Sequence, residues 1–265
     1  FNNIAWSSDA INWSGSAIFT SNTAGNSSVF SSYGGGIAAN TSNNMCVATG
    51  SGTNTIAFSP DGITWSGINS SIFGSSNGVN GGVYSPQLNR WVLCGPINTH
   101  SIAYSNDGIT WTGASTIFSS QGRCVDWNGS MFVAGGNGTN TMAYSYDGMN
   151  WYNQGNPWTS GYVMGVRWAA SLSRWVAVGG NANSTTTIAY SSDGLNWTAA
   201  TSSTSIFNYF GYDVAWNGSN LFVACGYASS NTLATSANGI SWSGLGTSTF
   251  SSEGRGIAYS PSLNR

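Results

Sequence analysis

Large and small side chains alternate along this chain in a short phrase that recurs six times. The phrase reads Ile-Ala-aromatic-Ser-x-Asp-Gly-x-x-Trp, and in one copy the large Ile188 and Tyr190 alternate with the small Ala189 and Ser191. A period of two predicts a short β-strand with one large and one small face, and the Asp-Gly pair after it predicts a tight turn. The six copies occupy residues 4–13, 56–65, 102–111, 142–151, 188–197 and 233–242.

The phrase is the second half of a longer repeat that predicts four strands. A first strand such as Cys124–Trp127 and a second strand such as Phe132–Gly135 precede the Ile-Ala-aromatic-Ser strand, and the fourth strand carries the closing tryptophan. The closing tryptophans are separated by 52, 46, 40, 46 and 45 residues. A repeat of this length built from short strands is typical of a β-propeller, in which each repeat forms one sheet, or blade.

Five repeats are complete in the sequence, and the two ends of the chain supply parts of a sixth. Residues 4–13 correspond to strands three and four, and residues 255–260 correspond to a first strand. We therefore predict a six-bladed, all-β propeller of four-stranded antiparallel blades, with the sixth blade shared by the termini. Seven blades are the alternative if an entire repeat is missing. Residues 1–265 are expected to form a single domain that is a fragment of a longer chain. The complete repeats span 34–67, 80–113, 122–153, 163–199 and 211–244.

The connections between strands have recognisable sequences. Asn-Gly at 128–129 and at 217–218 predicts a tight type I′ hairpin between the first two strands. The aspartates of the Asp-Gly turns are expected to accept backbone N–H bonds, and each glycine to supply an unusual backbone angle. A further aromatic residue recurs between the repeats, and we expect it to fill the groove between blades. It is Phe30, Phe73, Phe118, Trp158, Phe207 or Phe250.

The Ser-x-Asp-Gly-x-x-Trp turn resembles the Asp-box of sialidase-type propellers, and it is similar to repeats of photosystem assembly propellers. The resemblance covers the whole chain, with one departure: the Asp-box has a residue between Asp and Gly that is absent here. The repeat is therefore identified as a shortened relative. The resemblance implies a propeller fold and a structural role for the box, and it implies no catalytic residue.

Composition narrows the possible functions. Charged residues make up 5% of the chain, all six basic residues are arginine, and the net charge is −2. Such a chain offers no basic surface for nucleic acid, and no apolar run is long enough for a membrane helix. A polar but uncharged surface is common in extracellular, virion and cell-envelope proteins, and we expect this localisation. The four cysteines lie singly in predicted strands, so we expect buried thiols, with a disulfide as the alternative.

Candidate chemistry is sparse, and no metal site or cofactor is predicted. Five of the eight acids belong to the recurring turn, which leaves Asp126, Asp213 and Glu253. The lone His100 has no metal-ligand or catalytic pattern around it. Glycoside hydrolysis needs two suitably spaced carboxylates, and three isolated acids without a shared motif support it weakly. We therefore expect no enzymatic activity and keep a glycoside hydrolase as a minor alternative.

Polar residues break the repeat symmetry at the first strands, which line the central channel of a propeller. Arg123 and Arg255 share one slot that Tyr212 fills in another repeat, and Arg167 aligns with Asp126 of the preceding repeat. An ion pair is the structural interpretation of Asp126 and Arg167. The alternative interpretation is a polar channel mouth that binds an anionic or sugar ligand. The predicted ligand-binding set is Arg123, Asp126, Arg167, Tyr212, Asp213 and Arg255.

These patterns favour a non-catalytic, surface-exposed recognition or adhesion module with a glycan or protein partner. Loops rich in Asn, Ser, Thr and Tyr suit carbohydrate ligands, and less regular loops such as 152–154 and 208–209 are further candidates. The runner-up is a structural head or decoration protein of a virion, appendage or cell envelope, within a larger assembly. No nucleic-acid binding and no membrane insertion are expected.

Overall fold

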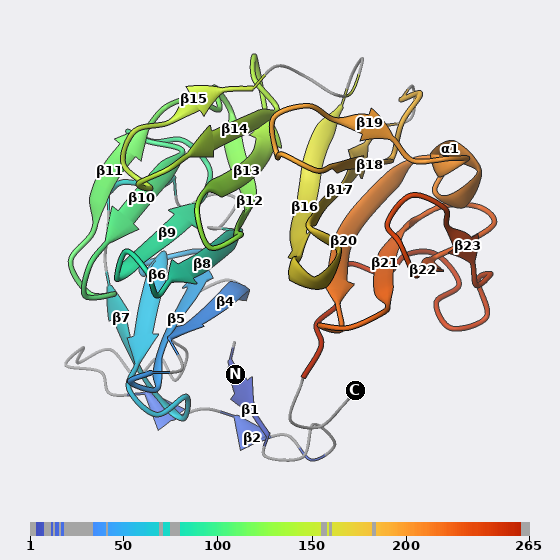
Figure 1. The fold of residues 1–265 in the computed structure, drawn as a ribbon. Helices are drawn as coiled ribbons and strands as arrows, with labels where there is room; N and C mark the ends of the chain where they lie inside the picture. The colour runs from blue at the N-terminus through green and yellow to red at the C-terminus, as the bar shows by residue number, and fades with distance from the viewer. Residues whose placement is uncertain are drawn as a thin grey trace. The chain divides into compact units, whose positions relative to one another are not determined.

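The computed structural model describes residues 4–7, 12, 14–15, 17–18, 34–40, 42–68, 71–74, 80–154, 158, 161–181 and 184–260. The chain divides into two compact units, one of residues 1–123 with 146–151 and one of 124–145 with 152–265. Each unit is described by itself, and the expectation of a single domain over 1–265 stays a prediction. Almost every element is a β-strand (Figure 1).

The first unit contains two complete blades. The strands of the first blade are β4 (Gly34–Asn40), β5 (Met45–Gly50), β6 (Ile56–Ser59) and β7 (Thr64–Ile68). This blade gains the short β3 (Ala17–Ile18), which pairs in parallel with β7. The second blade consists of β8 (Gly81–Ser85), β9 (Arg90–Cys94), β10 (Ile102–Ser105) and β11 (Thr112–Ser115). In addition, β1 (Ala5–Trp6) pairs with β2 (Ser14–Gly15) at the start of the chain.

Three further four-stranded sheets follow, and apart from the first residues of β12 they belong to the second unit. The third blade contains β12 (Gln121–Trp127), β13 (Phe132–Asn137), β14 (Met142–Ser145) and β15 (Tyr152–Asn153). The fourth contains β16 (Tyr162–Ala169), β17 (Arg174–Gly180), β18 (Ile188–Ser191) and β19 (Thr198–Ala199). The fifth contains β20 (Phe210–Trp216), β21 (Phe222–Tyr227), β22 (Leu233–Ser236) and β23 (Ser243–Gly244). Two short helices, η1 (Ala170–Leu172) and α1 (Ser203–Ile206), lie in the connections.

The predicted blade architecture is confirmed, with two corrections. Each complete repeat forms an antiparallel sheet in the order first, second, third, fourth strand. The closing tryptophan lies inside the fourth strand only in β7, and in the other four complete blades it directly precedes that strand. Residues 255–260, expected as a first strand, have no strand assignment. A strand exists through its ladder of hydrogen bonds, and no strand in the described part of the chain pairs with these residues.

The large and small faces of the strands pack as the alternation predicts. A Cβ placed on Gly211 of β20 would lie 2.7 Å from Cβ of Val178 in β17, so the absence of a side chain lets neighbouring blades approach. Four of the recurring aromatic residues are buried as expected, namely Phe73, Phe118, Trp158 and Phe207. Phe250 is 44% exposed, so for this residue the expectation is wrong. Phe30 lies outside the described residues.

The Asn-Gly loops are longer than the type I′ hairpin predicted from them. Gly129 and Gly218 have positive φ, but neither Asn128 nor Asn217 does. The asparagine side chain acts instead: Oδ1 of Asn128 accepts the N–H groups of Ser130 and Met131, both at 2.8 Å. This side-chain bonding closes a four-residue loop between β12 and β13 without a second residue in the left-handed region.

Candidate functional site

The acids of the recurring turn are fully engaged in structure. In the copy around Asp193, Oδ1 accepts the N–H groups of Leu195 and Asn196 at 2.8 and 2.7 Å, and the hydroxyl of Ser191 donates to the same atom. The N–H of Gly194, whose φ is +72°, donates to Ser191 Oγ at 2.9 Å. The same bonds recur around Asp61 and Asp107, and Asn238 reproduces them without a charge. These residues therefore serve as turn caps, and Asp9 lies outside the described residues.

Hydrogen bonding lowers the pKa of the turn aspartates Asp61, Asp107 and Asp193. Backbone N–H donors, first from Thr64 and then from Ile63, lower the pKa of Asp61 to about 2. At Asp107, burial by itself would raise the pKa, but the N–H groups of Thr110 and Ile109 outweigh it and bring the pKa to about 2. Such carboxyls remain ionised at neutral pH and have no proton to donate, so they are unsuited to general acid catalysis.

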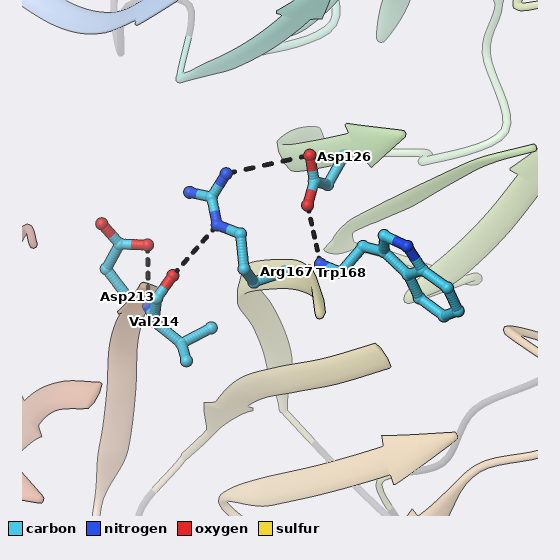
Figure 2. A network of polar contacts seen from close by, with 5 residues as sticks. All are labelled: Asp126, Arg167, Trp168, Asp213 and Val214. Carbon is cyan, nitrogen blue, oxygen red and sulfur yellow. Dashed lines mark hydrogen bonds and ion pairs between the residues drawn. The ribbon is translucent and has the colours of Figure 1, made fainter. Parts of the chain in front are cut away.

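A second group of polar residues links the first strands of three successive blades in the second unit (Figure 2). Asp126 of β12 faces Arg167 of β16, with Oδ1 3.8 Å from Nη1, so the ion pair predicted for these residues is confirmed. Nε of Arg167 donates to the carbonyl of Val214 in β20 at 3.3 Å. The side chain of Arg167 is 40% exposed, so it also reaches solvent.

Both carboxylates of this group accept backbone N–H groups from the next repeat. Oδ2 of Asp126 accepts the N–H of Trp168 at 2.8 Å, and Oδ2 of Asp213 accepts the N–H of Ile257 at 3.0 Å. Burial is the largest influence on each, and it raises the pKa of both carboxyls against the lowering effect of Arg167 and the backbone donors. Gly165 makes room for this arrangement, since a Cβ there would lie 3.1 Å from Cα of Asp213.

A row of aromatic rings occupies the starts of β16 and β20, which lie side by side (Figure 1). The rings of Tyr162 and Phe210 have centroids 6.4 Å apart and an interplanar angle of 4°. The ring of Tyr212 follows, with its centroid 5.8 Å from that of Phe210 and an interplanar angle of 12°. The first ring of the row is solvent-accessible, because Tyr162 is 38% exposed. We call Tyr162, Phe210 and Tyr212 the aromatic row.

The aromatic row ends at a charged pair. The guanidinium of Arg255 lies over the ring of Tyr212, 5.1 Å from its centroid, and its Nε donates to Oε1 of Glu253 at 2.8 Å. The side chain of Arg255 is 71% exposed and that of Glu253 is 30% exposed. The hydrogen bond to Glu253 is the largest cause of a raised pKa of Arg255, which keeps the guanidinium charged. The charged pair thus lies beside the partly buried Tyr212, at the opposite end of the row from the exposed Tyr162.

The predicted ligand-binding residues separate into groups in the structure. Asp126, Arg167 and Asp213 form the network between strands, whereas Tyr212 and Arg255 belong to the end of the aromatic row. Arg123 belongs to the first unit and the other five residues to the second. The sequence prediction missed Tyr162, Phe210 and Glu253. For Tyr162 and Phe210, the sequence position could have predicted the contact, because these residues begin the first strands of consecutive repeats.

The remaining chemical groups do not build a further site among the described residues. No group of three or more His, Cys, Asp or Glu side chains there could hold a metal ion. Nδ1 of His100 lies 3.1 Å from Oγ1 of Thr99, and its ring packs against the place where Gly113 has no side chain. None of the four cysteines, all described, is in a disulfide. No helix in the described ranges has the length and apolar character to cross a membrane.

Comparison with solved structures identifies the fold. The GH74 enzyme of Niastella koreensis superposes with a TM-score of 0.61 at 19% identity, over 82% of this chain and 38% of the enzyme. A chain of the nidogen/laminin complex gives a TM-score of 0.59 at 14% identity, over 78% of this chain and 76% of that one. The structure of YCF48 bound to D1 peptide gives a TM-score of 0.54 at 13% identity, over 79% of this chain and 65% of that one. The fold is a β-propeller.

These likenesses concern the fold alone, because all three identities are below 20%. This chain spans 38% of the length of the GH74 enzyme. No protein-family model matches the sequence. No curated protein matches it either.

Proposed function

We propose that this propeller is a non-catalytic recognition and adhesion module exposed at a virion or cell surface, and that its ligand is a glycan. The observation that carries the proposal is the aromatic row with Arg255 and Glu253 at its end. Ligand sites combine apolar or aromatic surface with a few placed polar groups, and sugars offer both C–H surface and hydroxyls to such a site. The low charge of the chain also supports a partner that is uncharged and extracellular.

Within the same proposal, the recurring turn has a structural role. We propose that the Ser-x-Asp-Gly-x-x-Trp turn is a shortened Asp-box, since its aspartate caps the turn and its tryptophan bonds back to the turn. In the copy at 188–197, Nε1 of Trp197 donates to the carbonyl of Gly194 at 3.2 Å. The box therefore builds the scaffold, and the ligand site lies elsewhere.

We propose no catalysis for Asp126 and Asp213, the two buried acids of the first strands. Their raised pKa is a property that glycosidase acids share, and this keeps a glycoside hydrolase as a minor alternative. However, oxygens of each carboxylate accept backbone N–H groups of the next repeat, so their geometry serves the joints between blades. Release of reducing sugar from a glycan bound by the protein would overturn this part of the proposal.

The test is a screen of the purified propeller on a broad glycan array, followed by binding measurements on variants. We expect saturable binding to a related set of sugars, and a loss of about 2 kcal/mol, or about 30-fold in affinity, in Tyr162→Ala. Tyr152→Ala is the matched control, because Tyr152 is also exposed and its ring contacts that of Tyr144, with centroids 5.4 Å apart, outside the aromatic row. Loss in the control with retention in Tyr162→Ala would place the site in the 152–154 loop.

The architectural alternative gives a different result in the same screen. A structural head or decoration protein of a larger assembly would bind no glycan while remaining folded. A blank array from protein with an intact cooperative unfolding transition would therefore favour that alternative.

A further inference from the structure

Three residues at the end of the aromatic row form one connected group, which we call the Tyr-Glu-Arg triad: Tyr212, Glu253 and Arg255. Glu253 accepts Nε–H of Arg255 at 2.8 Å, and the guanidinium of Arg255 lies over the ring of Tyr212, 5.1 Å from its centroid. Burial, and after it the negative charge of Glu253, raises the pKa of Tyr212, so its hydroxyl stays protonated. The triad is overall neutral, because one carboxylate balances one guanidinium.

Backbone contacts hold the triad in place although its segment forms no strand. Glu253 makes an antiparallel bridge with Tyr227, and the N–H of Gly254 donates to the carbonyl of Gly226 at 3.0 Å. On the other side of Arg255, the N–H of Ile257 donates to Asp213 at 3.0 Å. These anchors fix the segment on both sides of the arginine, so ligand binding there need not order a loose loop.

The triad leaves donors and acceptors for a ligand. Arg255 uses Nε toward Glu253, and its side chain is 71% exposed, so the Nη groups face solvent. Glu253 uses Oε1 in this bond and is 30% exposed, so its carboxylate remains reachable as an acceptor. A guanidinium donates only and a carboxylate accepts only, whereas a hydroxyl does both. Two neighbouring hydroxyls of a sugar can therefore bond to both groups at once.

We propose that the Tyr-Glu-Arg triad binds an uncharged sugar residue through adjacent hydroxyl groups, with neighbouring parts of the glycan lying on the aromatic row. This proposal rests on the proposed function and names the ligand class of that site. A carboxylated or sulfated sugar is disfavoured, since Glu253 already neutralises Arg255 and would repel a second anion placed against it. The partner is thus distinguished by chemistry, as a neutral glycan.

The experiment compares neutral and acidic glycans on the same array and then measures affinity across ionic strength. We expect binding to neutral glycans, with affinity changing less than about twofold between about 0.05 and 0.5 M NaCl, because no net charge is neutralised. Arg255→Ala should weaken binding by about 30-fold or more, and Tyr212→Phe by about tenfold. Arg174→Met is the control for loss of a positive charge in the same unit, and it should bind as the wild type does.

Glu253→Gln gives the discriminating readout. The amide keeps an acceptor oxygen but removes the negative charge, so we expect neutral glycans to bind about tenfold more weakly and acidic glycans to gain affinity. Preferential binding of acidic glycans by the wild type, or a steep fall in affinity with salt, would overturn the proposal and leave the glycan-binding function standing. Absence of binding to every glycan would instead remove the proposed function itself.

Discussion

At the scale of single residues, the repeated turn is held by one serine and one aspartate or asparagine. The side-chain oxygen accepts two backbone N–H groups that the tight turn leaves without backbone partners, as an N-cap residue does in a helix. Asn238 occupies the aspartate position of the fifth blade and makes the same two bonds at 2.9 and 3.0 Å. The acceptor oxygen, and not the charge, is therefore what the turn requires.

Replacing Asp193 tests this requirement. Asp193→Ala leaves the N–H groups of Leu195 and Asn196 without their acceptor, and we expect the free energy of unfolding to fall by about 1 kcal/mol. Asp193→Asn retains the acceptor and should cost less than half as much, as Asn238 indicates. Urea unfolding of the two variants measures the difference. Equal losses in both would show that the charge is what matters.

The lowered pKa of Asp107 predicts an acid-sensitive contribution to stability. Its pKa is about 2 in the folded state, against an ordinary value of 3.8, so the folded state binds its proton less readily than the unfolded chain. The stabilisation is complete above about pH 4 and is lost as the pH falls toward 2. In thermal unfolding between these pH values, Asp107→Asn should lose less stability than the wild type. A parallel decline in both proteins would contradict the assignment.

At the scale of elements, the residue at or just before the start of the second strand contacts the turn of the following blade in the second, third and fourth blades. Arg90 donates from Nη1 to the carbonyl of Asp147 at 2.6 Å, and Arg174 donates to that of Asn238 at 2.6 Å. Each guanidinium also lies over an aromatic ring, Arg90 over Tyr104 and Arg174 over Tyr190. Methionine fills the same slot elsewhere: a Cβ on Gly194 would lie 3.3 Å from Cε of Met131. A long flexible side chain is the shared feature.

Substitutions at Arg174 separate packing from hydrogen bonding. Arg174→Met keeps the length of the side chain and matches Met131, so we expect a loss of stability below about 1 kcal/mol. Arg174→Ala removes both the stem and the hydrogen bond to Asn238 and should cost about 2 kcal/mol. Chemical denaturation of both variants is the measurement. A methionine variant as unstable as the alanine variant would assign the whole effect to the hydrogen bond and the ring contact.

At the scale of the whole molecule, polar side chains join the first strands of successive blades within each unit. Asn80 donates to the carbonyl of Gly122 at 3.0 Å in the first unit, whereas Asp126, Arg167 and Asp213 make the corresponding joints in the second. Hydrogen-bonded sheets are self-contained, so blades need such cross-links in addition to apolar packing to fix their register. The polar residues that differ between these first strands are thus explained in part by the hydrogen bonds that they make between blades.

The buried carboxyl of Asp126, which joins two blades, makes the stability of the folded protein depend on pH. Its pKa is raised in the folded state, so between about pH 4 and that higher value the folded protein holds a proton that the unfolded chain has lost. Stability from this group therefore falls as the pH rises above about 4. Asp126→Asn keeps an acceptor for Trp168, and the stability of the wild type relative to this variant should decrease from pH 4 to pH 7 in urea titrations. An increase over that range would contradict the direction of the pKa change.

The sequence by itself determined the repeat, its strands and its turns. Strand alternation, the Asp-Gly turn and most of the recurring aromatic residues are local patterns, and local backbone preferences decide them. Predictions from the sequence were wrong where the structure of a segment depends on a partner distant in the chain. Residues 255–260 lack a pairing strand, and Phe250 is exposed although its described equivalents are buried. The long Asn-Gly loop escaped prediction because the side chain of Asn128 competes with the backbone for the same donors.

Only the tertiary structure decided how the polar residues are grouped. Sequence alignment of the repeats placed Asp126 opposite Arg167 correctly, since equivalent positions of neighbouring blades face each other. It could not show that the carboxylate of Asp213 is engaged by Ile257, or that Tyr162, Phe210 and Tyr212 form one row. Such contacts depend on the exact stagger between sheets and on side-chain direction, and a repeating sequence specifies neither, because many registers satisfy the same alternation.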